Sequence, residues 1–406
     1  MKRKVLITGC DTITALGLGV NETWNNILEG HSGVGLITRF DTETLETKIA
    51  AQVPDTFDSI VSQYCKRRNE KKMTFVTKMA FVSACKAICA SGIDFANCDR
   101  SRCGVILGIV NTGYTSVEMQ KGTSDRIVKA MNNAPSAWIS MEYGLEGPNF
   151  PIATACASSA YAMAFAYELI ANNQADVIIT GGADSTICPE EIQGFNEILA
   201  LSTRNEIPQK ACRPFTKTRD GFVIGEGAGM MVFESEEHAK KRSAEIIAEM
   251  GGYALTSEAY NIVSPRPEGI GMANTMERAL VNSGVNKEDV DYVNAHGTST
   301  LLNDKYETEA IKKVFDQHAY KLAVSSTKSL IGHTIGAAGA IEGITTILSL
   351  KNNKLTPTIN YDDPDPELDL DYVPNISRDK VLNIALSNSF GFGGHNATLV
   401  FKKYNR

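Results

Sequence analysis

Short, continuous apolar runs alternate along the chain with longer segments in which small, polar and apolar residues are mixed. The runs predict buried strands, and the longer segments predict helices. Because unbroken β-branched runs between helices are typical of sheets covered on both faces, the pattern predicts an α/β protein. The expected strands are Val5–Thr8 ending in a turn at Gly9, Cys103–Gly108, Ala175–Gly182 with its last two residues in a turn, Gly229–Glu234, Ala244–Met250, Asp291–Ala295, Leu322–Ser326 and Leu382–Leu386. The expected helices include Thr74–Ala90, Ala157–Ala171, His238–Arg242, Tyr306–Phe315 and Ala337–Leu350.

A faint internal symmetry divides the chain near residue 250. Each half contains a strand, then a polar residue, then a helix rich in glycine and alanine, at 152–160 in the first half and at 324–339 in the second. The pattern predicts two halves, 1–247 and 248–406, each with reactive groups at its strand ends.

The composition narrows the classes of protein. The chain has 406 residues, 43% of them apolar and 21% charged, which is close to the average for soluble globular proteins. Its 40 Lys and Arg residues against 47 Asp and Glu residues give a net charge of -7, so nucleic-acid binding is not expected. No run of about 18 apolar residues predicts a membrane span. The apolar run that follows the basic N-terminus is too short for a signal peptide.

Nine cysteines are scattered along the chain without CxxC pairs or the Cys/His spacing of a zinc site. In a chain of this length, an odd and scattered set predicts reduced thiols and therefore a cytoplasmic protein. No metal site is expected.

Cys156 stands where an apolar strand gives way to a helix of small and aromatic residues. Such a helix is expected to be buried on all sides. Its N-terminus presents free N–H groups and the positive end of the helix dipole. A cysteine there is expected to have a lowered pKa and to be nucleophilic. A buried structural cysteine is the alternative interpretation.

Two of the six histidines share one context. His296, in Asn294–Thr300, and His333, in Lys328–Gly339, both follow strands and lie among small and hydroxyl residues. A lone histidine there is usually structural, but two of them with Cys156 predict a Cys-His-His set. A zinc site is the weaker interpretation, because no HExxH or CxxC spacing is present.

Two glycine-rich segments, 225–229 and 388–396, are candidates for backbone contacts with a ligand. Neither matches GxGxxG followed by a helix or GxxxxGK[ST], so nucleotide binding is not expected. The second, with Phe390 and Phe392 between glycines, suits a turn that presents backbone N–H groups and a bulky ring.

Together these segments resemble the β-ketoacyl-acyl-carrier-protein synthases, specifically the elongating type II group of the thiolase-like superfamily. Five segments match the family in order, and they cover essentially the whole chain. Two histidines, in place of one histidine and one asparagine, are typical of elongating rather than initiating synthases. The matching segments are Thr154–Cys156, Arg213–Phe215 with Arg219–Gly227, Asn294–Thr300, Ser326–Ser329 with Gly332–His333, and Asn388–Gly394.

The resemblance implies a thiolase fold, with two α/β halves related by a pseudo-twofold axis in a five-layer αβαβα arrangement. It also implies a dimer and a decarboxylative Claisen condensation in fatty acid or polyketide elongation. Cys156 would receive an acyl chain from acyl carrier protein. Malonyl on a second carrier would then lose carbon dioxide, and its enolate would attack the acyl thioester. The phosphopantetheine belongs to the carrier, so no cofactor of the chain's own is implied.

The resemblance also assigns roles to residues. His296 and His333 would bind the malonyl thioester oxygen and stabilise the enolate, as preorganised donors do. The N–H groups of Cys156 and Phe390 would form the oxyanion hole, and Phe390 would gate the acyl pocket. The remaining assignments are Lys328 with Glu342 behind it as electrostatic support, Thr298 and Thr300 for the phosphopantetheine arm, and the basic residues Arg67, Arg68, Lys71 and Lys72 for docking an acidic carrier protein. A merely solvated charged surface is the alternative for that basic cluster.

Some positions depart from the family pattern. Asn111 stands where many fatty acid enzymes have an aliphatic residue facing the acyl pocket, and an unsatisfied buried amide costs about 1–3 kcal/mol. His395 replaces a small hydroxyl residue, and Thr216 replaces a frequent aspartate. The segments 303–309 and 369–374 resemble type II polyketide ketosynthases, which pair with a silent chain-length factor. Homodimer and heterodimer both stay open at this point.

Two other functions fit the sequence less well. A coenzyme A thiolase would carry a second cysteine in the C-terminal glycine-rich motif, but no cysteine follows Cys212. A non-catalytic partner subunit would typically lack the nucleophile, whereas Cys156, His296, His333 and Lys328 are all present. A condensing enzyme acting on carrier-bound thioesters is therefore the expected function.

Overall fold

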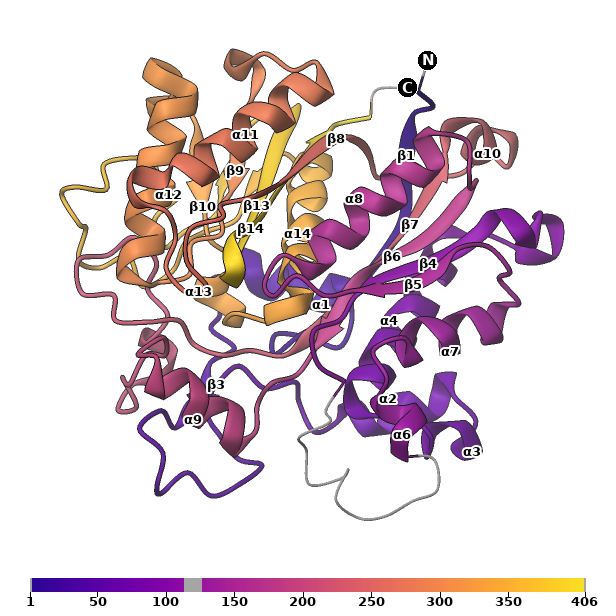
Figure 1. The fold of residues 1–406 in the computed structure, drawn as a ribbon, viewed down its shortest axis with the longest axis horizontal. Helices are drawn as coiled ribbons and strands as arrows, with labels where there is room; N and C mark the ends of the chain where they lie inside the picture. Colours follow the sequence, from indigo (N-terminus) through magenta and orange to yellow (C-terminus); the bar gives the residue numbers. More distant parts are fainter. Residues whose placement is uncertain (1, 113–125, 405–406) are drawn as a thin grey trace.

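Strands and helices alternate along the chain (Figure 1), in a computed structural model that describes residues 2–112 and 126–404. The strands are β1 Val5–Ile13, β2 Gly35–Leu36, β3 Ile49–Ala50, β4 Cys103–Gly108, β5 Asn149–Ile152, β6 Val177–Asp184, β7 Gly227–Ser235, β8 Ala248–Ser257, β9 Tyr292–Asn294, β10 Ala323–Ser325, β11 Lys354–Leu355, β12 Arg378–Asp379, β13 Ile384–Gly391 and β14 His395–Lys402. The α-helices are α1 Val20–Leu28, α2 Phe57–Tyr64, α3 Arg67–Glu70, α4 Phe75–Ser91, α6 Arg126–Ala130, α7 Ala134–Tyr143, α8 Ser158–Ala171, α9 Pro189–Glu197, α10 Glu236–Lys241, α11 Ile270–Ser283, α12 Leu301–Phe315, α13 Lys328–Ile331 and α14 Ala338–Asn352.

The two halves of the chain repeat one sheet topology. In the first half the strand order is β5-β4-β6-β7-β1, and in the second it is β10-β9-β13-β14-β8. Strand directions correspond as well, because β5, β4 and β6 are parallel, as are β10, β9 and β13, while the other neighbours are antiparallel. A short pairing of Val5–Ile7 with Ala248–Met250 joins the two sheets at one corner. This repeat confirms the symmetry that was faint in the sequence.

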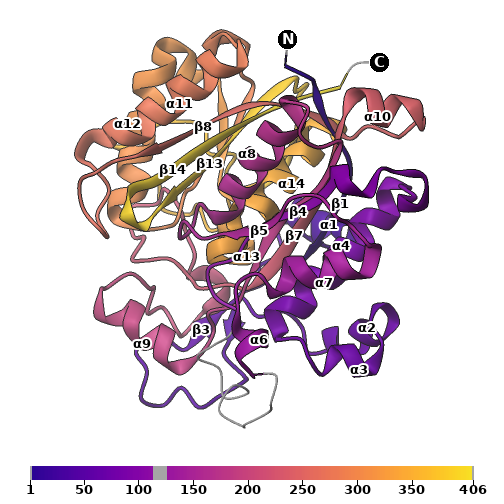
Figure 2. The ribbon, with the colours of Figure 1, turned by 45° about the vertical axis from the view of Figure 1, so that its right-hand side comes forward.

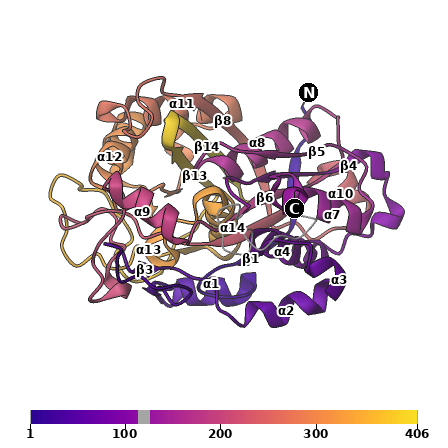
Figure 3. The ribbon, with the colours of Figure 1, turned by 60° about the horizontal axis from the view of Figure 1, so that its bottom comes forward.

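The sheets and helices form five layers. Helices α8 and α14 lie side by side between the two sheets (Figure 2), where they bury the central hydrophobic core. Helix α4 covers the outer face of the first sheet, and α11 with α12 covers that of the second. The view from below places α11 and α12 opposite α1 and α2 (Figure 3). The expected thiolase fold, a five-layer αβαβα arrangement of two related halves, is confirmed.

Two turns predicted at glycines were wrong. Gly9 lies within β1, and Gly181 and Gly182 lie within β6. These glycines serve close helix–strand packing: a Cβ on Gly9 would lie 2.2 Å from the Ala87 carbonyl oxygen, and one on Gly182 would lie 2.8 Å from Ser159 Cβ. A glycine in a predicted strand can therefore indicate that a helix packs closely against the strand, and not that the strand ends in a turn.

Three further details refine the predictions. The strand expected at Ala244–Met250 begins later, because β8 runs from Ala248 to Ser257. Helix α8 is buried over most of its surface but leaves the Phe165 side chain 44% exposed. Among the described residues, no helix is both long enough and apolar enough to cross a membrane.

Candidate active site

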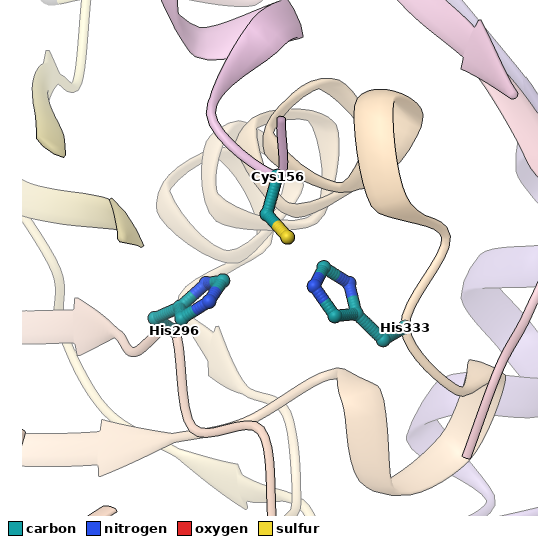
Figure 4. Close-up of side chains that lie close together, drawn as sticks. All are labelled: Cys156, His296 and His333. Atoms are coloured by element: carbon teal, nitrogen blue, oxygen red, sulfur yellow. The ribbon is translucent and has the colours of Figure 1, made fainter. Parts of the chain in front are cut away.

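Cys156, His296 and His333 converge at one buried point (Figure 4). The Cys156 sulfur and the ring nitrogens of the two histidines lie within 4.8 Å of one another. Cys156 immediately precedes α8, His296 follows β9, and His333 follows α13. The sulfur points toward the space between the two imidazole rings, whose centroids are 5.4 Å apart. The structure therefore brings together the set that the sequence predicted.

A tight backbone turn aims the Cys156 side chain. Ala155, the preceding residue, has φ 48, in the left-handed region that residues other than glycine seldom adopt. The turn is held by Ala157 N–H donating to the Thr154 carbonyl (3.1 Å) and Thr154 N–H donating to Ser158 Oγ (2.8 Å). Strained backbone of this kind persists where its surroundings fix it, and it concentrates at functional sites.

The pKa expected for Cys156 was wrong in direction. Burial raises the pKa of its thiol to about 12, although the Lys328 charge and the Phe392 backbone N–H both act to lower it. Helix α8 begins only at Ser158, with Ala157 as its N-cap, so its first N–H groups are not centred on the sulfur. At neutral pH the thiol is therefore protonated, and it needs a neighbouring base in order to attack.

Lys328 fixes the proton position on His296. The Lys328 Nζ donates to the His296 carbonyl oxygen (2.6 Å), to Glu342 Oε1 and to His296 Nδ1 (3.2 Å). An ammonium group can only donate, so Nδ1 accepts and the neutral ring carries its proton on Nε2. Glu342 thus lies behind Lys328, as expected, and both side chains are 1% exposed.

Both histidines are neutral. Burial lowers the pKa of each well below its usual value of 6.5, and the Lys328 charge lowers both further. Neither ring nitrogen of His333 has a hydrogen-bond partner among the described residues. The ring is held instead by its backbone, which donates to the Val223 carbonyl (2.7 Å), and by edge contact with Phe222. His333 can consequently accept one proton and donate another.

Two buried acids on α12 support the His296 loop, and the sequence analysis assigned them no role. Glu307 accepts hydrogen bonds from the backbone N–H groups of His296 and Gly297, each at 2.8 Å. Asp304 accepts from the N–H of Ser299 at 3.2 Å. Burial raises the pKa of both carboxyl groups. The available signal was the position of Glu307, an acid in the apolar stripe of the helix predicted at Tyr306–Phe315, whereas Asp304 lay before that predicted helix.

A cavity of about 290 Å³ leads from the Cys156 sulfur to the surface. Thr298 and Thr300 line it and share a hydrogen bond between their hydroxyls (2.9 Å). Phe390, 7% exposed, also lines it and packs edge-on against His296. At its mouth, Leu199 and Leu301 are 84% and 58% exposed. The cavity therefore suits a long, narrow chain that ends at the sulfur.

The other predicted residues lie outside this cavity. Asn111 is half-buried after β4, and its amide donates to Glu191 Oε1 at 3.4 Å. Its predicted place in the acyl pocket stays a prediction, since it is not among the residues lining the described cavity. The basic cluster lies on and just after α3, with Arg67, Arg68 and Lys71 exposed and Lys72 half-buried.

The same three side chains are near enough to hold a metal ion. The Lys328 ammonium, however, donates to His296 Nδ1 and places positive charge beside any such ion. The arrangement favours acid–base and nucleophilic chemistry, and the absence of a metal stays a prediction.

We expect Gly391→Ala to impair turnover by about tenfold or more while leaving the fold intact. The backbone of Gly391 has φ -96, which any residue can adopt, but an added Cβ would lie 3.2 Å from the Cys156 backbone nitrogen. Small displacements of this kind misplace reacting groups.

Gly194→Ala is the matched control, because no atom lies within 4 Å of a Cβ built at that helical position. It should retain activity and gain up to about 1 kcal/mol of stability. Steady-state kinetics and thermal melts of both variants provide the measurement. Full activity in Gly391→Ala would show that the turn tolerates a side chain.

Comparison with known proteins agrees with this geometry. Residues 2–239 match the "Beta-ketoacyl synthase, N-terminal domain" family, and residues 247–362 match the "Beta-ketoacyl synthase, C-terminal domain" family. A 3-oxoacyl-[acyl-carrier-protein] synthase 2 of Coxiella burnetii is 43% identical over 412 residues, which cover 99% of each chain.

Solved structures of similar proteins have the same fold over the full length of both chains. A ketosynthase in complex with its type II polyketide synthase acyl-carrier protein has a TM-score of 0.91 at 32% identity. The ishigamide ketosynthase/chain length factor has a TM-score of 0.92 at 30% identity. With this fold and with its cysteine and two histidines in one cavity, the chain belongs to the β-ketoacyl synthase family and is an acyltransferase.

Proposed function

We propose that the chain elongates carrier-bound acyl groups by decarboxylative Claisen condensation, with Cys156 as the nucleophile. The observation that carries the proposal is a protonated thiol beside two neutral imidazoles at the end of a narrow cavity. A single nucleophile with separate donor and acceptor nitrogens suits an acyl transfer followed by reaction of an enolate.

In the first step the sulfur of Cys156 attacks the thioester carbonyl of the acyl carrier. His333 takes the thiol proton, because its ring nitrogens have no protein partner and His296 Nδ1 already accepts from Lys328. As the C–S bond to the carrier breaks, the proton passes to the departing phosphopantetheine thiol. The acyl group is then on Cys156, and His333 is again neutral.

In the second step the malonyl thioester binds with its carbonyl oxygen near both histidines. Loss of carbon dioxide leaves an electron pair that becomes an enolate, and its oxygen receives hydrogen bonds from His296 Nε2–H and a ring N–H of His333. The enolate carbon attacks the acyl carbonyl and forms the new C–C bond. The Cys156 sulfur leaves as a thiolate and takes up one proton from solvent, which balances the loss of carbon dioxide from the malonyl carboxylate. Donors already in place at developing charge account for a large part of enzymatic rate acceleration.

The direct test supplies acyl-carrier and malonyl-carrier to the purified chain. Intact-mass spectrometry should show a β-ketoacyl-carrier with two more carbons, together with release of one carbon dioxide per product. Formation of product from two coenzyme A thioesters, without decarboxylation, would identify a thiolase instead. If no product forms even when a second synthase-like subunit is supplied, the result would favour the interpretation that this chain is a non-catalytic partner subunit.

Carrier binding would use two features of the surface. Thr298 and Thr300 line the cavity wall where the phosphopantetheine arm would pass, and the basic cluster on α3 would face an acidic carrier. We expect Arg67→Glu/Arg68→Glu to raise KM for the acyl carrier about tenfold at low salt, with kcat unchanged. Lys240→Glu/Lys241→Glu, on α10, is the charge-matched control. A KM that rises equally in the control would exclude specific docking at α3.

A dimer would be formed through the edge strand β5. Within the described residues β5 ends the sheet, and apolar side chains surround it: Met141 on α7, Phe165 on α8 and Ile127 on α6 are 63%, 44% and 72% exposed. Figure 2 shows these elements in a column on one face. Pairing of β5 with its equivalent would cover them. Light scattering should give twice the 44.0 kDa of one chain for a homodimer, whereas a chain that is monomeric until a second subunit is added supports a heterodimer.

The pocket for the growing chain would accept short, unsaturated or oxygenated groups near Asn111. The Asn111 amide donates to Glu191 Oε1, and an oxygenated chain would add a polar partner that a saturated tail does not offer. A difference of about 1.4 kcal/mol corresponds to tenfold in rate. Asn111→Ile should therefore shift the preference toward longer saturated chains by about that factor. Glu191→Gln is the control, because it changes the carboxylate that accepts from Asn111 but keeps the Asn111 amide. Acylation rates measured with a series of saturated and polar acyl chains test this shift in preference. If the wild-type protein already prefers long saturated chains, fatty acid elongation is indicated.

A cytoplasmic location is consistent with the state of the thiols. Cys10, Cys65, Cys85, Cys103 and Cys212 are buried free thiols. Reduced thiols persist in such a compartment. Localisation of a tagged full chain in fractionated cells is the corresponding measurement.

A further inference from the structure

A second group of reactive side chains lies outside the active-site cavity, between α10 and the segment that leads into β4. His238 Nδ1 is 2.6 Å from Glu234 Oε2, and His238 Nε2 is 3.5 Å from the sulfur of Cys98. The Cys103 thiol lies near enough to Cys98 that each of the two groups shifts the pKa of the other. None of these four residues lines the cavity that holds Cys156.

Glu234 is held as a carboxylate that orients His238. It accepts from Arg242 Nε (2.9 Å) and Nη2 (2.5 Å) and from the Thr8 hydroxyl. Burial acts to raise its pKa, but the hydrogen bonds from Arg242, His238 and Thr8 outweigh burial and lower that pKa to about 2. A carboxylate can only accept, so His238 Nδ1 donates. In the neutral ring Nε2 is then an acceptor that faces Cys98.

Cys98 is a thiol with a base at its side. Burial, with help from the Glu234 charge, raises the pKa of Cys98, so the thiol is protonated at neutral pH. Its nearest acceptors are the Asp94 carbonyl oxygen (3.4 Å) and His238 Nε2 (3.5 Å). Cys98, His238 and Glu234 are therefore arranged as a nucleophile, a base and a carboxylate that orients the base. Cys98 is half-buried, and the His238 side chain is 20% exposed, so a small oxidant can reach both.

Cys103 supplies a second thiol at the same place. It begins β4, its side chain is buried, and its S–H donates to the Asp99 carbonyl oxygen at 3.3 Å. An accessible thiol with a buried thiol nearby is an arrangement in which an oxidised cysteine can be captured as a disulfide.

We propose that Cys98 is a redox modification site, oxidised by hydroperoxides with His238 as its base and captured by Cys103 as a disulfide. The Cys98 sulfur attacks one oxygen of the O–O bond while its proton moves to His238 Nε2. The O–O bond breaks, Cys98 becomes a sulfenic acid, and the other oxygen leaves as water or alcohol with the proton from His238. The Cys103 sulfur then attacks the Cys98 sulfur, forms the S–S bond and releases the hydroxyl group as water. Sulfur is oxidised and the peroxide is reduced.

Cys89 provides a matched control within the same protein. It is exposed, and within the described part of the chain its sulfur makes no hydrogen bond to a histidine. Cys89 and Cys98 share one tryptic peptide, while Arg100 and Arg102 allow trypsin to separate Cys98 from Cys103. A disulfide between the latter pair therefore appears as two linked peptides.

The experiment treats the full-length protein with substoichiometric hydrogen peroxide, blocks the remaining thiols and analyses the tryptic peptides. We expect Cys98 to be oxidised at least about tenfold faster than Cys89, although Cys89 is more exposed. A linked Cys98–Cys103 pair should form. In Cys103→Ser, dimedone should label Cys98 as a trapped sulfenic acid. In His238→Asn, which keeps an N–H for Glu234 but removes Nε2, the oxidation rate should fall by on the order of 10²-fold.

A pH profile separates a base from a structural role. In His238→Asn the Cys98 rate should rise with pH as the thiolate fraction grows, and its difference from the wild-type rate should narrow as the pH increases. Oxidation of Cys98 no faster than Cys89, or an unchanged rate in His238→Asn, would overturn the role of His238. Over-oxidation of Cys98 without a linked peptide would overturn the role of Cys103. If His238→Asn fails to fold, the comparison with Cys89 and the trapping in Cys103→Ser still decide the proposal.

Discussion

We expect Cys156→Ala to lose both acylation and condensation, with turnover reduced by at least about 10³-fold, because no other thiol is among the described residues that line the cavity. The side chain is small and 5% exposed, so the free energy of unfolding should change by only on the order of 1 kcal/mol. Peptide mass spectrometry after incubation with acyl carrier should find the acyl group on Cys156 in the wild type and on no residue in the variant.

Cys89→Ser is the control, since it changes an exposed thiol on α4. It should retain full activity. Acylation that persists at a stoichiometric level in Cys156→Ala would contradict the assignment of the nucleophile. Activity that is lost in both variants would point to a general effect of the substitutions on the fold.

The fold was largely readable from the sequence, because burial in parallel strands produces unbroken apolar runs. The predicted bounds of the strand Cys103–Gly108 agree with the observed ones, and the predicted bounds of helix α4 differ from the observed ones by only one residue at each end. The errors came from glycines: local chemistry suggested turns at Gly9 and Gly182, whereas packing of α4 and α8 against the sheets required small residues. Long-range packing of this kind leaves no signature in the neighbouring residues.

The members of the site were predictable, but their electrostatics were not. Motifs in the resemblance indicated Cys156, His296 and His333, and the structure brings them together. The prediction of a lowered Cys156 pKa weighed the helix dipole alone. Burial of the sulfur depends on side chains from both halves of the chain, and it outweighs the dipole. The same burial makes both histidines neutral, a charge state that the sequence analysis did not address.

The supporting residues were missed for a related reason. Glu307 receives the His296 and Gly297 N–H groups across the interface between α12 and the loop after β9. Its partners are backbone groups, which every residue carries, so no sequence pattern identifies them. Only the position of an acid in an apolar stripe indicated that a buried partner had to exist.

The two histidine variants should separate the two chemical steps. In His296→Ala and in His333→Ala, malonyl decarboxylation should fall by on the order of 10²–10³, because each removes a donor from the developing enolate oxygen. Cys156 should still become acylated in His296→Ala, and it should become acylated more slowly in His333→Ala, where the thiol has lost its proton acceptor. Release of carbon dioxide from malonyl-carrier and mass analysis of the Cys156 peptide report the two steps independently, and decarboxylation at the wild-type rate in both variants would exclude this role.

The pH dependence of acylation then distinguishes one histidine from the other. In the wild type the thiol proton passes to a neutral His333, so the rate should stay flat above about pH 6.5 and fall only well below it, where the ring gains a proton. In His333→Ala no neutral acceptor remains, since His296 Nδ1 is occupied by Lys328 and its Nε2 already carries a proton. Attack must then use thiolate formed by solvent, and because burial raises the Cys156 pKa to about 12, the rate should rise about tenfold per pH unit across the neutral range. His296→Ala should keep the flat profile of the wild type. A steep profile in His296→Ala and a flat one in His333→Ala would reverse the assignment and make His296 the acceptor of the thiol proton.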